Sequence, residues 1–308
     1  MGMRSITTIP MVVILLSSNL LITIAIPSDG SDPPIEEFDN NPESSIFAGG
    51  DGSPSDPYRI SNASELQDVN SDLAANYVLI NDIDCSDTIN WMGGFSPLGF
   101  FTGTLNGNEF NITDLYIEVY DSYVGLFSQI ETEGKVVNLN LVDAHITGIP
   151  DGHFPSASYV GGIAGRNSGS IINCTCSGTI KGKESVGGIT GKLTGEVMNS
   201  TSHCKVFGNK KIGGLAGSVG GSGGEGHIKD SSANVEVKGN STVGGLVGRM
   251  TEGTIGECSV RGDIFGNYTV GGIVGEYGRS ILGEYTAGFS DCSFIGKVIG
   301  RDEVGGLI

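Results

Sequence analysis

Three aspartates in the first third of the chain have the residue type and spacing for acid–base or cation chemistry. Asp82, Asp84 and Asp87 lie close together, and Ile83 separates the first two. Two carboxylates can cleave a glycosidic bond, and several together can bind Ca²⁺. An Asp–Ile–Asp alternation is also typical of a strand with one solvated face. We favour the solvated strand face, with a weak Ca²⁺ site and a catalytic pair as alternatives.

The chain has six cysteines, which could form disulfide bonds in an exported protein. When the chain is aligned on its internal repeats, one column holds Cys174, Ser200, Ser231, Cys258 and Cys292. Such a column predicts small, stacked side chains near a core. Cys258 and Cys292 fall on adjacent repeats, so a disulfide bond between them is an alternative to free thiols. Cys/His pairs do not recur at zinc-ligand spacing, and we expect no other metal site.

Other catalytic signatures are missing or accidental. The histidines do not form the HExxH motif of metallopeptidases (His145, His153, His203 and His227). Gly220–Gly224 matches the G-x-S-x-G pattern of a nucleophile elbow, but a run of glycines produces this match by chance. We therefore predict that the chain is not an enzyme, with no catalytic residue and no cofactor.

Asn-x-Ser/Thr sequons occur repeatedly and predict glycosylation of an exported chain. Their asparagines are Asn62, Asn111, Asn173, Asn199, Asn240 and Asn267. In the repeat alignment, Asn173 shares a column with Asn199, and Asn240 shares another with Asn267. Sugars would then lie in rows on an exposed flank.

The first 27 residues have the layout of a secretory signal peptide. Arg4 precedes an apolar run from Ile9 to Ile26, which small and turn-forming residues follow. An uncleaved anchor is the alternative, because the run approaches the length that spans a bilayer. Either interpretation places the remaining chain in the secreted or extracellular cell-surface compartment. Residues 28–46 form an acidic linker.

Composition excludes several classes of protein. The net charge is −18, with 35 acidic and 17 basic residues, which argues against nucleic acid as a partner. Glycine contributes 51 of the 308 residues without a G-X-Y period, so the chain is not collagen-like. Abundant glycine with ordinary hydrophobicity is typical of a repeat protein with regular turns.

A hexamer of the form V-G-G-[IL]-x-G recurs along the second half of the chain. Complete copies begin at Val160, Val186, Ile212, Val243 and Val270. A degenerate copy begins at Val124, and a copy from Val304 to Ile308 stops before its last glycine. The shared glycines are Gly161, Gly162, Gly165, Gly187, Gly188, Gly191, Gly213, Gly214, Gly217, Gly244, Gly245, Gly248, Gly271, Gly272 and Gly275.

The basic period is 26 residues, as between Val160 and Val186. Each period contains short Ile-, Val- and Thr-rich segments that predict two or three strands. Such a unit buries its apolar face only by stacking on its neighbours. The pattern therefore predicts an all-β fold, a parallel β-solenoid of about 26-residue coils. Glycine suits its corners because it permits positive φ and has no side chain to crowd the next coil.

The hexamers resemble the GLUG motif, which occurs in cell-surface proteins of archaea and bacteria and in bacterial IgA-specific metallopeptidases. The upstream segment is also similar to the one that precedes such repeats, with Gly49–Gly52, Asp56–Ile60, Leu79–Asp84 and Phe101–Asn108. The similarity extends from about residue 47 to residue 308. It implies a right-handed β-helix like that of filamentous adhesins, and it implies no single activity.

We expect an N-terminal cap with the first coils at residues 47–121 and the repeat solenoid at residues 122–308. Ser61–Ala74 predicts a short helix before the first coil, where it would cover the open end of the stack. The incomplete last hexamer leads us to expect a solenoid that is cut off at its C-terminus.

The function that we expect is that of an adhesin or envelope scaffold. Its binding loops would be the insertions Ile149–Ser158, Gly220–Gly226 and Arg279–Gly288. Cell-surface glycans or proteins are the expected partners. Membrane contact would come only through the N-terminal signal or a C-terminal anchor outside this chain. The alternatives are a non-catalytic front portion of a larger secreted enzyme, such as an IgA-type metallopeptidase, and a carbohydrate-active β-helix.

Overall fold

The computed structural model describes residues 11–15, 21–25, 46–92, 94–149, 159–278 and 286–308. It divides into two units, Met1–Ser45 and Ile46–Ile308. In the first unit, β1 (Met11–Leu15) pairs with β2 (Leu21–Ala25) in antiparallel fashion. Most of the predicted signal peptide and acidic linker lies outside the described residues, so both stay predictions. Within the described ranges, no helix has the length and apolarity needed to span a membrane.

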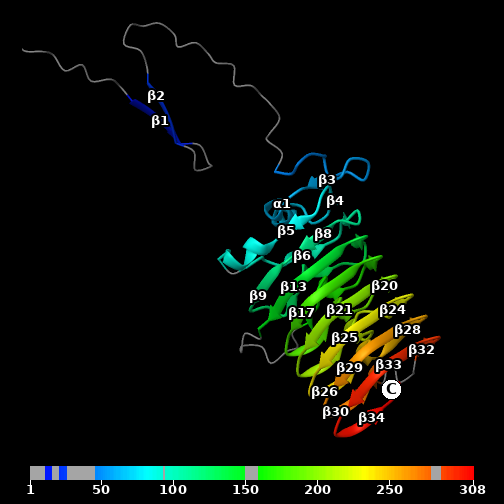
Figure 1. Ribbon diagram of the computed structural model, residues 1–308. Helices are drawn as coiled ribbons and strands as arrows, with labels where there is room; N and C mark the ends of the chain where they lie inside the picture. The colour runs from blue at the N-terminus through cyan, green and yellow to red at the C-terminus, as the bar shows by residue number, and fades with distance from the viewer. Residues whose placement is uncertain (1–10, 16–20, 26–45, 93, 150–158, 279–285) are drawn as a thin grey trace, which may run out of the picture. The chain divides into compact units, whose positions relative to one another are not determined.

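The second unit is a stack of coils whose strands form four parallel sheets, which we name I to IV (Figure 1). The predicted parallel β-solenoid is therefore confirmed. A full coil contributes four short strands, one to each sheet, and not the two or three that we predicted. The strands of two to four residues were missed because they are too short to show an apolar alternation.

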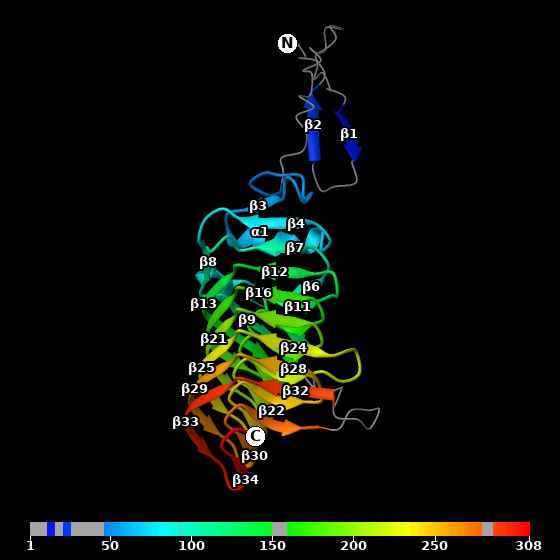
Figure 2. The same ribbon diagram turned by 90° about the vertical axis from the view of Figure 1, so that its right-hand side faces the viewer.

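Sheets I and II form two faces of the stack. Figure 2 shows the strands of sheet I lying one below another. Sheet I contains β3 (Tyr58–Ile60), β4 (Asn76–Leu79), β7 (Thr104–Asn106), β12 (Lys135–Val137), β16 (Ser170–Ile172), β20 (Glu196–Met198), β24 (Gly226–Lys229), β28 (Glu252–Gly256) and β32 (Thr286–Ser290). Sheet II contains β5 (Ile83–Asp84), β8 (Asn111–Thr113), β9 (Tyr116–Val119), β13 (Asn140–Gly148), β17 (Thr175–Lys181), β21 (Thr201–Phe207), β25 (Ser232–Lys238), β29 (Ser259–Phe265) and β33 (Ser293–Ile299).

Sheets III and IV meet at the hexamers. Sheet III contains β10 (Tyr123–Val124), β14 (Tyr159–Val160), β18 (Glu184–Gly187), β22 (Lys210–Gly213), β26 (Ser241–Gly244), β30 (Tyr268–Gly271) and β34 (Asp302–Gly305). Sheet IV contains β6 (Leu98–Phe101), β11 (Phe127–Ile130), β15 (Ala164–Asn167), β19 (Thr190–Leu193), β23 (Ala216–Val219), β27 (Val247–Met250) and β31 (Val274–Tyr277). Each complete hexamer forms the corner between these two sheets.

The core consists of columns of aliphatic side chains in strict register. In sheet I, Ile171 pairs with Val197, Val197 with Ile228, and Ile228 with Ile255. All four side chains are at most 1% exposed. Each coil thus buries its apolar face on the next, which is why the repeat needs neighbours to fold.

The hexamer glycines have one of the two roles that we predicted. None has a positive φ; the left-handed corners belong instead to other residue types, such as Ser185 (φ 51°) and Asn173 (φ 60°). What the glycines provide is space. A Cβ atom on Gly188 would lie 2.0 Å from Ser202 Oγ and 2.4 Å from the carbonyl oxygen of Gly214. These glycines are therefore required because the next coil lies against them.

The predicted cap helix exists, but it is shorter and placed differently. α1 (Ala63–Asp68) continues into the 3-10 helix η1 (Val69–Ser71), and both follow β3 instead of preceding the first coil. The Asn62 side chain caps the helix by accepting a hydrogen bond from the Glu65 N–H. Glu65 Oε2 accepts from the Ser61 N–H. A second 3-10 helix, η2, spans Ser86–Asn90.

The α1–η1 segment covers the open edge of sheet IV through its side-chain amides. Gln67 exchanges two hydrogen bonds with the backbone of Ser96, at 2.9 and 3.0 Å. Asn70 Oδ1 accepts a 2.9 Å bond from the Gly99 N–H in β6, the first strand of the sheet. The segment therefore satisfies backbone groups that would otherwise be free to pair with another strand.

Candidate functional site

The outer face of sheet I holds a groove lined by charged and polar side chains. β20, β24, β28 and β32 together outline a volume of about 420 Å³. Its polar lining comes from Glu196, His227, Lys229, Thr254 and Glu257. Because these residues lie on successive coils, the parallel register alone brings them together.

His227 is held across two coils at the centre of the groove. Its Nδ1 lies 2.9 Å from Thr254 Oγ1, and its Nε2 lies 3.9 Å from Glu225 Oε2. A hydroxyl beside an imidazole is the start of a nucleophilic site. Here the carboxylate is beyond hydrogen-bond distance and is 56% exposed, so it does not fix the imidazole. The geometry supports binding better than covalent catalysis.

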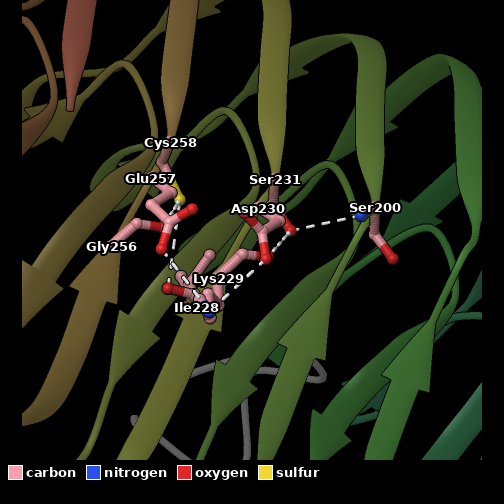
Figure 3. A network of polar contacts seen from close by, with 8 residues as sticks. All are labelled: Ser200, Ile228, Lys229, Asp230, Ser231, Gly256, Glu257 and Cys258. Atoms are coloured by element: carbon pink, nitrogen blue, oxygen red, sulfur yellow. Dashed lines mark hydrogen bonds and ion pairs between the residues drawn. The ribbon is translucent and has the colours of Figure 1, made fainter. Parts of the chain in front are cut away.

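Lys229 forms the charged rim of the groove (Figure 3). Its Nζ lies 3.4 Å from Glu257 Oε1 and 3.8 Å from Asp230 Oδ2. These side chains are all more than 40% exposed, so the pairs contribute little to stability and remain available to a ligand. The rim offers a cation and two carboxylates within reach of one polar molecule.

The predicted small-residue column lies directly behind this rim. Ser231 Oγ donates to the Lys229 carbonyl at 2.8 Å and accepts from the Ser200 N–H at 3.1 Å. In the same way, Ser200 Oγ donates to the Met198 carbonyl and accepts from the Cys174 N–H. Each small side chain thus pairs backbone groups of two coils at the corner between sheets I and II. The column fixes the position of the rim.

Two of the three aspartates accept hydrogen bonds from the backbone. Asp82 Oδ1 accepts from the Asn111 N–H, and Asp84 Oδ1 accepts from the Ser86 N–H, both at 2.8 Å. The bonds from Ser86 lower the pKa of Asp84. Across the described residues, no group of three or more His, Cys, Asp or Glu side chains is arranged to hold a metal ion. The structure therefore does not assemble the alternative Ca²⁺ site at Asp82, Asp84 and Asp87.

The sequon asparagines lie on the surface. Asn111 is half-buried, and the other five are exposed. Asn173 and Asn199 follow paired strands, and Asn267 Nδ2 donates a 2.8 Å bond to Asn240 Oδ1 on the previous coil. Each aligned pair of asparagines therefore lies on adjacent coils. Glycosylation itself stays a prediction.

The six cysteines are free thiols. Cys258 and Cys292 lie on adjacent coils, as predicted, because Ser259 pairs with Ser293. A second cysteine pair was not predicted: Cys176 and Cys204 have their sulfur atoms 3.4 Å apart. The alignment missed it because Cys176 pairs with Ser202 and Cys204 pairs with Gly178, so the cysteines occupy different columns.

Of the predicted binding loops, only the glycine-rich one lies within the described residues. Ile149–Ser158 and Arg279–Gly288 fall largely outside them. The loop after β23 lies near two basic side chains of sheet IV, since a Cβ on Gly223 would be 2.8 Å from Arg166 Nη2. In the strand register, Arg166 lies opposite Lys192 on the next coil. Burial lowers the pKa of Lys192, and the positive charges of Arg166 and Lys211 lower it further.

The coils and their hexamers define the class of protein: a parallel β-solenoid whose hexamers resemble the GLUG motif. Residues 156–181 match the family described as the GLUG motif, which confirms the predicted resemblance.

Two relatives share part of this sequence. Halomucin of Haloquadratum walsbyi is 37% identical over 145 residues, which cover 43% of this chain and 2% of halomucin. A protein of Evansella cellulosilytica, assigned as a Gly-rich membrane protein, is 38% identical over 141 residues, 42% of this chain and 16% of its own length. The matched segments are thus small parts of both relatives.

Two solved structures share the fold. A Bacteroides ovatus protein assigned as an immunoglobulin A1 protease superposes with a TM-score of 0.59 and 22% identity, over 82% of this chain and 80% of its own. A structure entitled IgA1 Protease gives a TM-score of 0.61 and 17% identity, over 80% of this chain and 20% of its own. At these identities the likeness establishes the solenoid fold.

Proposed function

We propose that this chain is a rigid binding module of an adhesin or envelope scaffold, which presents the sheet I groove to a polar partner. The observation that supports this most strongly is the row formed by His227 and Lys229 on one coil and by Thr254 and Glu257 on the next. A ligand with hydroxyl and charged groups repeating along its length, such as a cell-surface glycan, matches such a row. Backbone pairing in four sheets keeps the row in place without the ligand.

The proposed location is the extracellular cell surface, with the protein exported and glycosylated. The apolar run after Arg4 and the repeated sequons support export. The Evansella relative is named as a Gly-rich membrane protein, which agrees with a location at the cell surface. Detection of the intact chain on unpermeabilised cells by antibody, and its loss on protease shaving, would test this location.

Binding is tested best with two matched double variants of the full chain. His227→Ala with Lys229→Ala removes the centre and rim of the groove. His203→Ala with Lys205→Ala removes the same residue types, at the same spacing, from the outer face of sheet II. On a glycan array and on immobilised cell-envelope polysaccharide, we expect at least a tenfold loss of affinity for the first pair and less than a twofold change for the second. Equal losses, or none, would contradict the proposal.

A second candidate is the non-catalytic portion of a larger exported enzyme. The likeness to the structure entitled IgA1 Protease, over only 20% of that chain, supports it. This candidate predicts that the product of the complete gene cleaves immunoglobulin A while the 308-residue chain does not. A carbohydrate-active role is less favoured, because it needs two carboxylates on either side of one bond, whereas the two rim carboxylates, Asp230 and Glu257, both pair with Lys229.

A further inference from the structure

Two buried thiols on neighbouring coils face each other in the middle of the stack. Cys204 Sγ lies 3.4 Å from Cys176 Sγ, although the two residues are 28 positions apart in the chain. They are 1% and 0% exposed, respectively. The strands that hold them, β17 and β21, pair in parallel through seven consecutive residues, so the distance is set by regular structure.

The surroundings leave room for the sulfur atoms to approach. A Cβ on Gly162 would lie 2.3 Å from Cys176 Sγ, so this hexamer glycine makes space for the thiol. A disulfide bond has an S–S length of about 2.05 Å. Because the register places Cys204 two residues beyond the strand partner of Cys176, closing the remaining gap requires a small shift of β21 against β17 as well as rotation about χ1. The hydrogen bond between the two thiols, followed by burial, raises the pKa of Cys176.

We propose that Cys176 and Cys204 form an intramolecular disulfide bond that ties two successive coils together inside the core. The two thiols lose two protons and two electrons, and the S–S bond forms. The electrons reduce an external disulfide, such as oxidised glutathione or a thiol oxidase, to its two thiols. Because both thiols are buried in the closed stack, the exchange takes place during folding.

The bond would change how the stack opens. Without it, coils can peel away one after another, because each contacts only its neighbours. With it, the chain between the two cysteines stays closed on itself, which limits unravelling in the middle of the solenoid. This inference does not depend on the groove or its ligand.

The test is to refold the full chain in a redox buffer of oxidised and reduced glutathione and then block free thiols under denaturing conditions. We expect an intact mass that shows four alkylated cysteines, and a non-reduced digest that contains a peptide joining Cys176 to Cys204. We also expect the unfolding midpoint of the oxidised chain to lie about 5 °C or more above that of the reduced chain.

Substitutions taken from the neighbouring coils keep folding intact while removing the bond. Cys176→Ser copies Ser202, and Cys204→Val copies Val235, which follow them in the same columns. This double variant should show four alkylated cysteines after oxidation or reduction and no redox-dependent midpoint. Cys258→Ser, which copies Ser231, should retain the redox-dependent midpoint. Six alkylated cysteines in the oxidised wild-type chain, or a bond joining Cys258 to Cys292 instead, would overturn the proposal.

Discussion

The coils before the hexamers and the coils that contain them fill the same core in different ways. In residues 46–130, rings stack along the interior, with centroid distances of 4.6 Å for Phe47–Tyr58 and 4.7 Å for Phe101–Phe127. In the next coils, the position of Phe127 is taken by Ala164, then by Thr190. The early coils are therefore held by large side chains, and the repeat coils by close backbone approach.

The difference shows why glycine is concentrated in the hexamers. A small residue such as Ala164 leaves no cavity in the core, because the corner glycines bring the backbone of one coil against the next. Aromatic coils tolerate irregular corners, whereas repeat coils require the same glycines in every turn. Packing in the first region should therefore be sensitive to losing volume, and packing in the second to gaining it.

The largest effect should follow from adding one methyl group to a repeat corner. Gly188→Ala places a Cβ 2.4 Å from a backbone oxygen, which cannot move without shifting the next coil. We expect a loss of about 4 kcal/mol or failure to fold, measured by urea denaturation. Gly306→Ala is the matched control: it has the same position in the last hexamer and no atom within 4 Å. An equal loss in both variants would show that backbone conformation, not space, requires the glycine.

The sequence was sufficient for the coil, because the spacing from Val160 to Val186 to Ile212 is constant and reappears as the register of sheet III. It was insufficient for the left-handed corners, since Lys211 and Thr242 are not residues that signal a positive φ. It also could not reveal the groove, because His227 and Thr254 are 27 residues apart and meet only through parallel pairing.

Removing volume from an aromatic coil should have the next largest effect. Phe127→Ala puts in place the residue that the following coil carries as Ala164. Because the corner there has not closed around a small side chain, we expect a cavity and a loss of about 3–4 kcal/mol in the same assay. Phe127→Leu should lose about 1 kcal/mol. If Phe127→Ala costs less than Phe127→Leu, the comparison between the two regions is wrong.

A smaller effect should come from the side chains that cover the edge of sheet IV. Asn70→Ala removes the acceptor of the Gly99 N–H, and we expect a loss of about 1–2 kcal/mol. Faster amide exchange at Gly99 should accompany it, while amides in β19 keep their protection. Asn234→Ala, at an exposed position of sheet II, is the control and should change neither. Unchanged exchange at Gly99 would mean that the segment does not act as an edge cover.

The smallest difference concerns two ion pairs of equal length. Asp56–Arg59 in the early region and Glu184–Lys211 in the repeat are both 2.7 Å apart. The first has side chains 50% and 45% exposed, and the second 25% and 20%. Double-mutant cycles should give a coupling below about 0.5 kcal/mol for the exposed pair and about 1 kcal/mol for the shielded one. Equal couplings would indicate that screening is the same in both regions.

Distances along one column test the stacked-coil account most directly. Lys135, Ser170, Glu196, His227 and Thr254 occupy the same position in successive strands of sheet I. Spin labels at Lys135 and Thr254 should be about 19 Å apart, from four steps of about 4.8 Å. Labels at Lys135 and Glu196 should be about half as far apart. A Lys135–Thr254 distance above about 30 Å, or one that does not grow with the number of coils, would contradict the account.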